Sequence, residues 1–434
     1  MIVFLYPWFT IDAIIVWNLS NNSIFVIGWL SICWMQLNYL EKLMKIHDVH
    51  NNLTQPLLLL MTTAIAVTAA NLYYVQPILP LIAREFDLDM SELGIIPALN
   101  QFGYAIALLF ISPLGDSIAR RQLIAVLSLV LVVASSLTAF APNFAAIVTA
   151  MFFIGLGANI TQQLIPFAAS IVKAKDKAAT LGTLMMGLTL GILLSRTASG
   201  FVAEHFGWRG VYIMSGLVAV LFGLLLYVFL PVNKPQSNLR YWPLLQSTLS
   251  LFKRHKALQH FTLAGAFWFA AFNVLWATLA IYVSNDPFNY NAQQAGLFGV
   301  IALAGVIGAK VSGRWVNVLG SKTLIMLSLL LIAIGFIVTG LFASNLTALI
   351  IGIILIDFGV FSAQVSNQVR VFNIDETAQS RVNGIYMLGY YIGGALGSIA
   401  GVKAFALYQW HGVIAVSLVF ISLSAIFNCR AQQA

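Results

Sequence analysis

Charged residues are scarce in this 434-residue chain: Asp, Glu, Lys and Arg make up 8% of it, whereas hydrophobic residues make up 60%. An ordinary soluble domain carries about 25% charged residues. So few charges could not cover the surface of a water-soluble fold, which excludes that class of protein. The apolar stretches are long and do not alternate with polar residues, and this pattern indicates membrane-spanning helices rather than the strands of a barrel.

Cysteine is scarce too. The two cysteines, Cys33 and Cys429, lie one near each end of the chain, and they offer neither a disulfide framework nor a cysteine-based metal site. The sequence also lacks the HExxH and GxSxG motifs of metalloproteases and hydrolases. We therefore expect no metal, no cofactor and no catalytic residue, and the chain is not expected to be an enzyme.

Apolar stretches long enough to cross a membrane, at about 20 residues each, occur twelve times from Leu57 onward. The first six are 57–81, 93–114, 123–141, 144–172, 178–202 and 211–231, and the second six are 261–283, 294–313, 324–343, 346–369, 382–404 and 413–427. A polar, basic segment separates the two sets. The sequence therefore predicts an all-α membrane protein with an N-terminal half over 57–231, a cytoplasmic linker over 232–260 and a C-terminal half over 261–434.

The basic residues are spread thinly beside these stretches, although the net charge is +8. A nucleic-acid-binding protein gathers such residues in one dense patch, so nucleic acid is not an expected partner. When the loops are assigned alternately to the two sides of the bilayer, most Lys and Arg residues fall on the side of the two termini. The positive-inside rule then predicts a multi-pass protein with both termini in the cytoplasm.

The two halves repeat each other at an offset of 202 residues. The polar and aromatic matches are Asn71 with Asn273, Asn143 with Asn345, Gln162 with Gln364 and Trp208 with Trp410, and several glycines match as well. Two unrelated hydrophobic bundles readily match leucines, alanines and even glycines by chance. Matched asparagines, glutamines and tryptophans at one constant offset are much harder to obtain, so we interpret the offset as an internal repeat.

Two six-helix halves of equal topology, joined by a cytoplasmic loop, resemble a transporter of the major facilitator superfamily over about Met44 to the C-terminus. The loop over 112–121 resembles the family's signature of Gly, any residue, Leu, Ala, Asp, Arg, any residue, Gly, Arg, Arg. Asp116, Arg120 and Arg121 match that signature. The residues that depart from it are Ser112, Ser117 and Ala119.

Asp116, Arg120 and Arg121 are our candidates for a cytoplasmic gate. An aspartate at a helix end accepts hydrogen bonds from a neighbouring helix N-terminus and pairs with a nearby arginine. Such a cluster latches the two halves together in one state and releases them in the other. The alternative interpretation is that the two arginines only fix the topology.

Asp357 lies about eleven residues into the tenth predicted helix, near the bilayer midplane. A carboxylate there is costly and suggests a function. Phe361, Gln364 and Gln368 share its helix face. A protonatable acid at this depth would couple transport to protons; the alternative is a buried acid paired with a neighbouring helix.

The resemblance implies that the first, fourth, seventh and tenth helices line a central cavity. Asn71, Asn159, Gln162 and Asn273 would then offer amides from the first, fourth and seventh helices. These amides bind a polar group of the substrate or only tie helices together. Arg196, in the outer half of the fifth helix, either snorkels outward or compensates an acid inside the bundle.

Two departures weaken a comparison with proton-driven drug exporters of the family. Gly191 is followed by Ile192 where their antiporter signature has a Gly-Pro pair, and Met151 stands where many of them have an arginine.

Residues 1–56 have no counterpart in the repeat. Met1 to Leu40 is strongly apolar with Asp12 as its only charged residue, and it lacks the features of a secretory signal. This extension is either an additional membrane helix, for instance over 23–40, or the result of a start site called too early, with translation beginning at Met44.

The expected function is secondary active transport of a small organic molecule by alternating access, with proton-coupled efflux by antiport as the preferred mode. Proton-coupled uptake by symport is the alternative, and a transporter-like membrane sensor is the alternative from another class. The expected location is a bacterial inner membrane, with the lipid bilayer and protons as partners of a monomer. The sequence does not identify the substrate.

Overall fold

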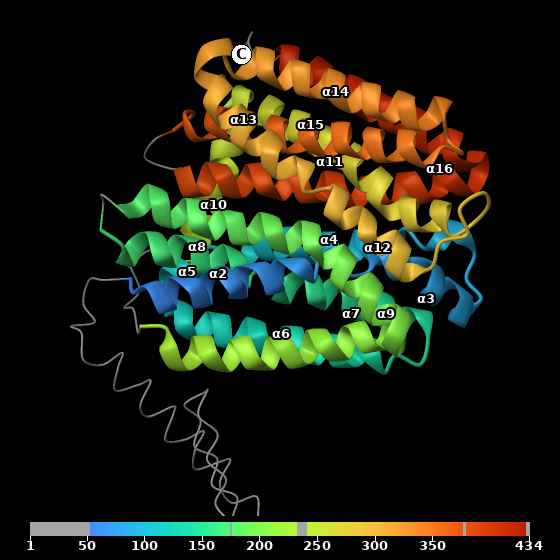
Figure 1. Ribbon diagram of the computed structural model, residues 1–434. Coiled ribbons are helices and arrows are strands. Elements are labelled where there is room, and N and C mark those ends of the chain that lie inside the picture. Colours follow the sequence, from blue (N-terminus) through green and yellow to red (C-terminus); the bar gives the residue numbers. More distant parts are fainter. Residues whose placement is uncertain (1–52, 174–175, 232–240, 376–378, 431–434) are drawn as a thin grey trace, which may run out of the picture. The chain divides into compact units, whose positions relative to one another are not determined.

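The computed structural model describes residues 53–173, 176–231, 241–375 and 379–430, apart from a few side chains within them (Figure 1). The predicted N-terminal extension, including its optional extra helix and Met44, lies outside the described residues except for its last few positions. The described residues from Leu53 onward form one unit.

Every regular element in the described part of the chain is a helix. The elements are α2 (Gln55–Ala70), η1 (Gln76–Ile78), α3 (Leu79–Phe86), η2 (Met90–Glu92), α4 (Ile95–Phe110), α5 (Leu114–Ser117), α6 (Arg120–Ala139), α7 (Phe144–Gly157), α8 (Ile160–Ile171), α9 (Lys177–Phe229), α10 (Tyr241–Arg254), α11 (Lys256–Val283), α12 (Ala292–Ile301), α13 (Ala304–Leu319), α14 (Ser321–Leu341), α15 (Leu346–Phe372) and α16 (Gln379–Arg430). The predicted all-α class is confirmed.

Nine helical stretches of the described chain are long and apolar enough to cross a membrane, and two of them, in α9 and α16, are about twice the usual length. Each of these two contains two spans, because the backbone leaves helical geometry at Gly207 in α9 and at Tyr408 and Gln409 in α16. These two breaks raise nine spans to eleven. The shorter apolar helix α2, continued by the turns up to η1, completes the twelve predicted spans.

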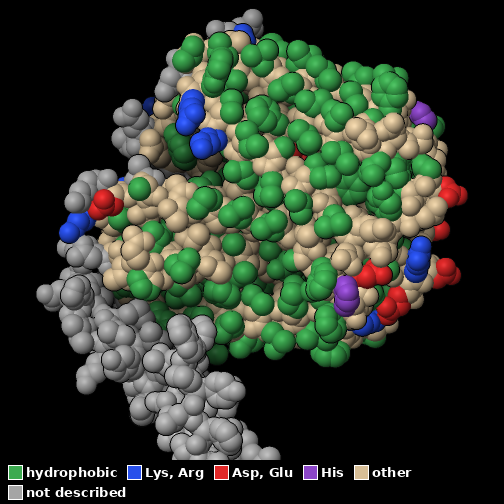
Figure 2. All heavy atoms as spheres, in the orientation of Figure 1, with side chains coloured by type: hydrophobic (Ala, Val, Ile, Leu, Met, Phe, Trp, Pro, Cys, Tyr) green, Lys and Arg blue, Asp and Glu red, His purple; other side chains and the backbone are tan. Residues whose placement is uncertain are grey.

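Charged side chains gather at the two ends of the helix bundle, and the band between them is covered by hydrophobic and uncharged side chains (Figure 2). Exposed Leu217, Leu224 and Leu330 are typical of the residues that cover the helices of this band. A surface of this kind is stable in lipid and not in water.

The two halves of the repeat use matched residues in matched places. Asn143 caps α7 by accepting a hydrogen bond from the backbone nitrogen of Ala146 at 2.9 Å. Asn345, at the offset of 202 residues, caps α15 by accepting one from Ala348 at 3.1 Å. Each cap satisfies a backbone donor that a helix start leaves free.

Close helix pairs are possible where glycine replaces a larger residue. A Cβ atom added to Gly191 of α9 would lie 2.2 Å from the carbonyl oxygen of Ala66 in α2. One added to Gly393 of α16 would lie 2.2 Å from the carbonyl oxygen of Ala266 in α11. The fifth span therefore packs on the first as the eleventh packs on the seventh, backbone against backbone.

We predict that Gly191→Ala destabilises the protein, because its methyl group has no room beside α2 and the helices must part. The cost is about 1 to 3 kcal/mol, as for other overpacked sites, and a thermal unfolding curve in detergent measures it. Gly182→Ala is the matched control in the same helix, since a Cβ there meets nothing within 4 Å. Equal melting temperatures of the two variants would contradict the packing account.

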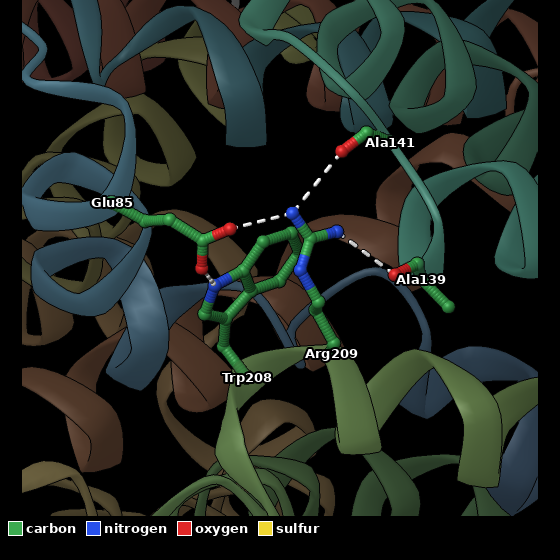
Figure 3. Close-up of polar contacts among 5 residues, drawn as sticks. All are labelled: Glu85, Ala139, Ala141, Trp208 and Arg209. Atoms are coloured by element: carbon green, nitrogen blue, oxygen red, sulfur yellow. Dashed lines mark hydrogen bonds and ion pairs between the residues drawn. The ribbon is translucent and has the colours of Figure 1, made fainter.

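A polar cluster ties α3 to the turn between the two spans of α9 (Figure 3). Glu85 accepts a hydrogen bond from Trp208 Nε1 at 2.6 Å and pairs with Arg209 Nη2 at 2.5 Å. Arg209 also donates to the backbone carbonyls of Ala139 and Ala141, at 2.9 and 3.1 Å. One glutamate thus connects the end of the first span to the turns that follow the third and fifth spans.

Glu85 lies outside the membrane-spanning segments, so its titration is open to measurement. Its partial burial acts to raise the pKa, but the hydrogen bonds from Trp208 and Arg209 and the charge of Arg209 outweigh it and hold the pKa below the ordinary value. A carboxyl group whose pKa is lowered by folding stabilises the fold above its unfolded pKa, about 4.3 for glutamate, and this contribution is lost as the pH falls through the lower folded value.

We therefore predict that Glu85→Gln lowers the melting temperature near neutral pH and that the difference from the parent shrinks as the pH falls below about 4.3. The contribution is modest, about 1 kcal/mol or less, because the side chains of Arg209 and Glu85 are 34% and 42% exposed. Glu204→Gln, an exposed acid in α9, is the control. A pH dependence that survives Glu85→Gln unchanged would contradict this assignment.

Candidate functional site

The two halves touch closely at one end of the bundle. The hydroxyl of Thr197 in α9 donates to the carbonyl oxygen of Gly296 in α12 at 2.9 Å, and a Cβ added to Gly200 would lie 2.4 Å from the carbonyl oxygen of Ala292. At the start of α4, a Cβ added to Gly94 would lie 2.8 Å from the backbone of α16. At these contacts, which define what we call the closed end, there is no room for a side chain between the halves. A cavity of about 210 Å³ lies beside them, lined by Arg84 and Glu204 of one half and by Tyr290 and Asn291 of the other.

At the other end, a cavity of about 150 Å³ lies between α4, α8, α10 and the start of α16. Its polar lining residues are Ser112, Arg120, Gln162, Thr248, Arg381 and Asn383. Two of them, Gln162 and Arg120, are predicted site residues. The described halves therefore meet through small residues at the closed end, and a cavity lies between them at each end.

Asp357 and Arg196 are the charged side chains buried deepest between the halves, at 0% and 1% exposure. Asp357 belongs to α15 and Arg196 to the first span of α9. Each lies eleven residues from the closed end of its span, Asp357 counted from Leu346 and Arg196 from Gly207, which is about 16 Å for an α-helix. They lie at one depth and interact electrostatically.

Neither carboxylate oxygen of Asp357 has a hydrogen-bond partner among the described residues. Arg196 is better satisfied: Nε donates to Gln76 Oε1 at 2.7 Å and Nη1 donates to the carbonyl oxygen of Ile192 at 3.2 Å. Its guanidinium lies 3.8 Å from the ring centre of Trp276, while Nη2 has no partner. An unpaired buried charge is costly. The carboxylate of Asp357 and Nη2 of Arg196 are both left without a hydrogen-bond partner among the described residues.

The remaining predicted amides divide into two kinds. Asn273 of α11 accepts a hydrogen bond from Gln101 of α4, which joins the two halves. Asn71 accepts from Ser215 at 2.5 Å and stays within the N-terminal half.

Asn159 also stays within its half, where it accepts hydrogen bonds from Ser112 at 3.1 Å and from Gln163 at 3.3 Å. For Asn71 and Asn159 the contacts are those of helix ties. Asn273 alone of these three asparagines contacts the opposite half.

The glutamines face the eleventh span or the cavity. Gln162 donates to the hydroxyl of Tyr104 at 2.9 Å. Gln364 accepts from the hydroxyl of Tyr386 at 2.7 Å, and Gln368 donates to Asn383 at 3.2 Å. Gln364 and Gln368 therefore lie on a polar face of α15 that contacts α16.

At the predicted gate, Arg120 is buried and lines the cavity, where its Nη1 donates to the carbonyl oxygen of Gln163 at 3.2 Å. Arg121 instead lies over the ring of Tyr227 at 4.6 Å, within its own half. The side chain of Asp116 lies outside the described part of the chain. The latch remains a prediction.

Buried tyrosines form a part of this region that the sequence did not reveal. Tyr104 of α4 lies 4.4 Å, centre to centre, from Tyr391 of α16, and Tyr391 interacts electrostatically with Tyr73. Tyr73 in turn lies 5.1 Å from the guanidinium of Arg196. Since Gln162 lines the cavity and contacts Tyr104, a continuous chain of contacts leads from the cavity to Arg196.

Gln101 was also missed. Its only signal is a second amide, next to Asn100, in an otherwise apolar span. Recognising its partner requires knowing which helices of the two halves meet.

We predict that Gln101→Leu weakens the closed end, because it removes the hydrogen bond to Asn273 across the halves. One such bond contributes about 1 kcal/mol, or about a fivefold change in an equilibrium. The measurement is the rate at which a membrane-impermeant maleimide labels a cysteine placed at Ser398, which is buried against the start of α4, after Cys33 and Cys429 are replaced by serine.

The expected result is labelling about fivefold faster than in the parent. Gln122→Leu, on an exposed position of α6, serves as the control for the same chemical change. If Gln101→Leu and Gln122→Leu label equally fast, the hydrogen bond does not hold this end closed.

Comparison with known proteins agrees with this architecture. Residues 61–374 and 263–431 match the family model described as Major Facilitator Superfamily. An uncharacterized transporter of Escherichia coli O157:H7, YgaY, is 35% identical over 364 residues, covering 84% of this chain and 92% of its own. A probable transporter of Streptomyces coelicolor, SCO4007, is 30% identical and covers 85% of each chain.

Two solved structures have the same fold. A bacterial homolog of the human lysosomal transporter Spinster, in an inward-facing and occupied conformation, gives a TM-score of 0.72 at 15% identity, over 87% of this chain and 96% of that one. A variant of the nucleoside transporter NupG gives 0.70 at 13% identity, over 87% and 99%. At these identities the likeness concerns the fold alone.

Proposed function

Because the chain belongs to the Major Facilitator Superfamily, we propose that it is a proton-coupled secondary active transporter that moves a small organic molecule across a bacterial inner membrane by alternating access. It is a multi-pass membrane protein of the transporter type. In the proposed cycle, the cavity between its two halves opens at one end and then at the other. We propose that it works as a monomer.

Asp357 is the observation that carries the proton coupling. It is fully buried, and its oxygens have no hydrogen-bond partner. Burial of a charged carboxylate in such a place raises the free energy of the protein, and protonation removes this penalty. Arg196, from the opposite half, is the charged group that acts on it. Any rotation of the halves changes their separation, and so changes the free energy of the charged form of Asp357.

The charges of Asp357 and Arg196 favour co-transport of the proton and the substrate over exchange of one for the other. When Asp357 is ionised, its charge and that of Arg196 cancel; when it is protonated, Arg196 is left with a net positive charge. A substrate that Arg196 binds is then bound together with the proton, and both move in the same direction. Exchange in the efflux direction stays the second candidate, because the loop over 112–121 resembles that of exporters.

The orientation follows from the distribution of charge. The end opposite the closed end carries Arg120, Arg121, Arg381 and the basic end of α10. We propose that this end faces the cytoplasm by the positive-inside rule, so both termini are cytoplasmic. Arg120, at the cavity wall, then lies at the proposed cytoplasmic gate with Asp116 and Arg121.

We predict that Asp357→Asn abolishes gradient-driven transport in proteoliposomes while leaving exchange of substrate between the two sides intact. Gradient-driven flux should fall about tenfold or more, equivalent to about 1.4 kcal/mol. The panel contains labelled small acids, amides and amines, each tested with the inside acidic and with the outside acidic. Asp89→Asn, an exposed acid, is the matched control.

The sign of the response separates the two modes of coupling. Accumulation on the alkaline side indicates co-transport with protons, and accumulation on the acidic side indicates exchange. Equal gradient-driven flux in the parent and in Asp357→Asn would contradict the role of Asp357. Loss of both gradient-driven flux and exchange would assign Asp357 to substrate binding or to structure instead of coupling.

A further inference from the structure

Arg196 has one hydrogen-bond donor that the fold leaves unused. Its Nε and Nη1 are bound to Gln76 and to the backbone of Ile192, whereas the buried Nη2 has no partner among the described residues. A buried donor on a charged group without a partner is destabilising. Such a donor is retained where another molecule completes it.

Aromatic rings fix the position of this arginine. Trp276 lies 3.8 Å from the guanidinium carbon, and Tyr73 and Phe272 lie at 5.1 and 5.7 Å. Such contacts hold the cation in place without neutralising its charge. The titratable groups that face Arg196 are Asp357 on α15 and Tyr73 after α2, and Arg196 is the charged group that faces Asp357.

We infer that Arg196 binds the substrate directly, and that the substrate is a monoanion, a single carboxylate attached to a flat, apolar body. This inference rests on the proposed function, since it names the class of molecule that the transporter carries. One free donor and one positive charge match one carboxylate, whereas a phosphate dianion would leave a charge unpaired. A cation would be repelled by Arg196.

The apolar body of the substrate is recognised by the rings beside the charged pair. Phe272 lies 6.3 Å from Phe361, edge to face, and Phe269 stacks on Tyr390 at 3.8 Å. Flat molecules pack well against such rings. Phe361 lies on α15 one turn beyond Asp357, so the same helix contacts the body of the substrate and binds the proton.

In the described conformation the space beside Arg196 is only about 10 Å³, lined by Gln76, Pro77, Trp276, Leu279 and others. This is about the space of one water molecule. The anion therefore binds in a conformation in which the halves have moved apart around Arg196. It is released when the halves come together there and the space beside Arg196 is lost. Protonation of Asp357 prepares the site, because an ionised carboxylate would compete with the substrate for the same guanidinium.

Three probes of equal shape and different charge test the inference: benzoate, benzamide and benzylamine. Equilibrium dialysis of each radiolabelled probe against the purified full chain measures its affinity at about pH 5 and about pH 8, where benzoate stays an anion and benzylamine a cation. We expect benzoate to bind at least about tenfold more tightly than either analogue, and more tightly at about pH 5 than at about pH 8.

Two variants separate the two groups. Asp357→Asn removes the competing charge, so benzoate should bind at about pH 8 as tightly as the parent binds it at about pH 5, without pH dependence. Arg196→Gln should lose the preference for benzoate over benzamide, whereas Arg196→Lys, which keeps the charge, should retain a weaker preference. Arg314→Gln, an exposed arginine of α13, should bind like the parent.

Equal affinities for benzoate and benzamide in the parent, or tighter binding of benzylamine, would overturn the inference. So would absence of benzoate binding to both the parent and Asp357→Asn. The proposed function fails differently, by a lack of any response to a proton gradient in proteoliposomes. A gradient response for amines alone would leave proton coupling standing and reject the anion, and benzoate binding without a gradient response would do the reverse.

Discussion

The burial of two opposite charges on different halves of the molecule is the constraint on which the rest of this structure depends. Asp357 and Arg196 are both withdrawn from solvent and lie at one depth, but Asp357 is not hydrogen-bonded to Arg196 or to any other described residue. Since the free energy of an unpaired buried charge is high, Asp357 in its charged form is the less stable member of the pair, because Arg196 has hydrogen bonds to Gln76 and Ile192. The two halves are therefore linked by the electrostatic attraction between Asp357 and Arg196 as well as by packing.

The surroundings of the pair support it from both halves. Gln76 and the rings of Tyr73, Phe272 and Trp276 hold Arg196 in position, while the hydrogen bond from Gln101 to Asn273 crosses between the halves. Most of these side chains come from the first, second and seventh spans. A movement of one half against the other would change the contacts of Arg196 with Phe272 and Trp276, which belong to the opposite half.

The sequence predicted the class and the spans because both follow from composition and from the length of apolar runs. It also predicted that Asp357 lies about eleven residues into its helix, where the structure has this side chain fully buried; its depth in the bilayer stays a prediction. The asparagine caps Asn143 and Asn345 lie where the repeat predicted equivalent residues. These properties are local to one helix or repeat twice, so they need no knowledge of the packing.

Contacts between helices could not be predicted in this way. Whether Arg196 snorkels or faces an acid depends on the rotation of α9 about its axis and on its neighbours in the other half. The contact of Gln101 with Asn273, and that of Tyr104 with Tyr391, join residues far apart in the chain. An amide or a tyrosine in an apolar span looks the same whether it ties its own half together, as Asn71 does, or reaches across.

The close contact of α9 with α12 at the closed end also bears on how efficiently the proposed transport would use a proton gradient. Thr197 is bonded to Gly296 and there is no room for a side chain at Gly200, so the two helices touch backbone to backbone at this place. A leak of protons at this place would discharge the gradient that a cell maintains across its membrane, without any substrate being carried. In the proton-coupled cycle that we propose, the small residues at this contact would limit the protons lost without transport of a substrate.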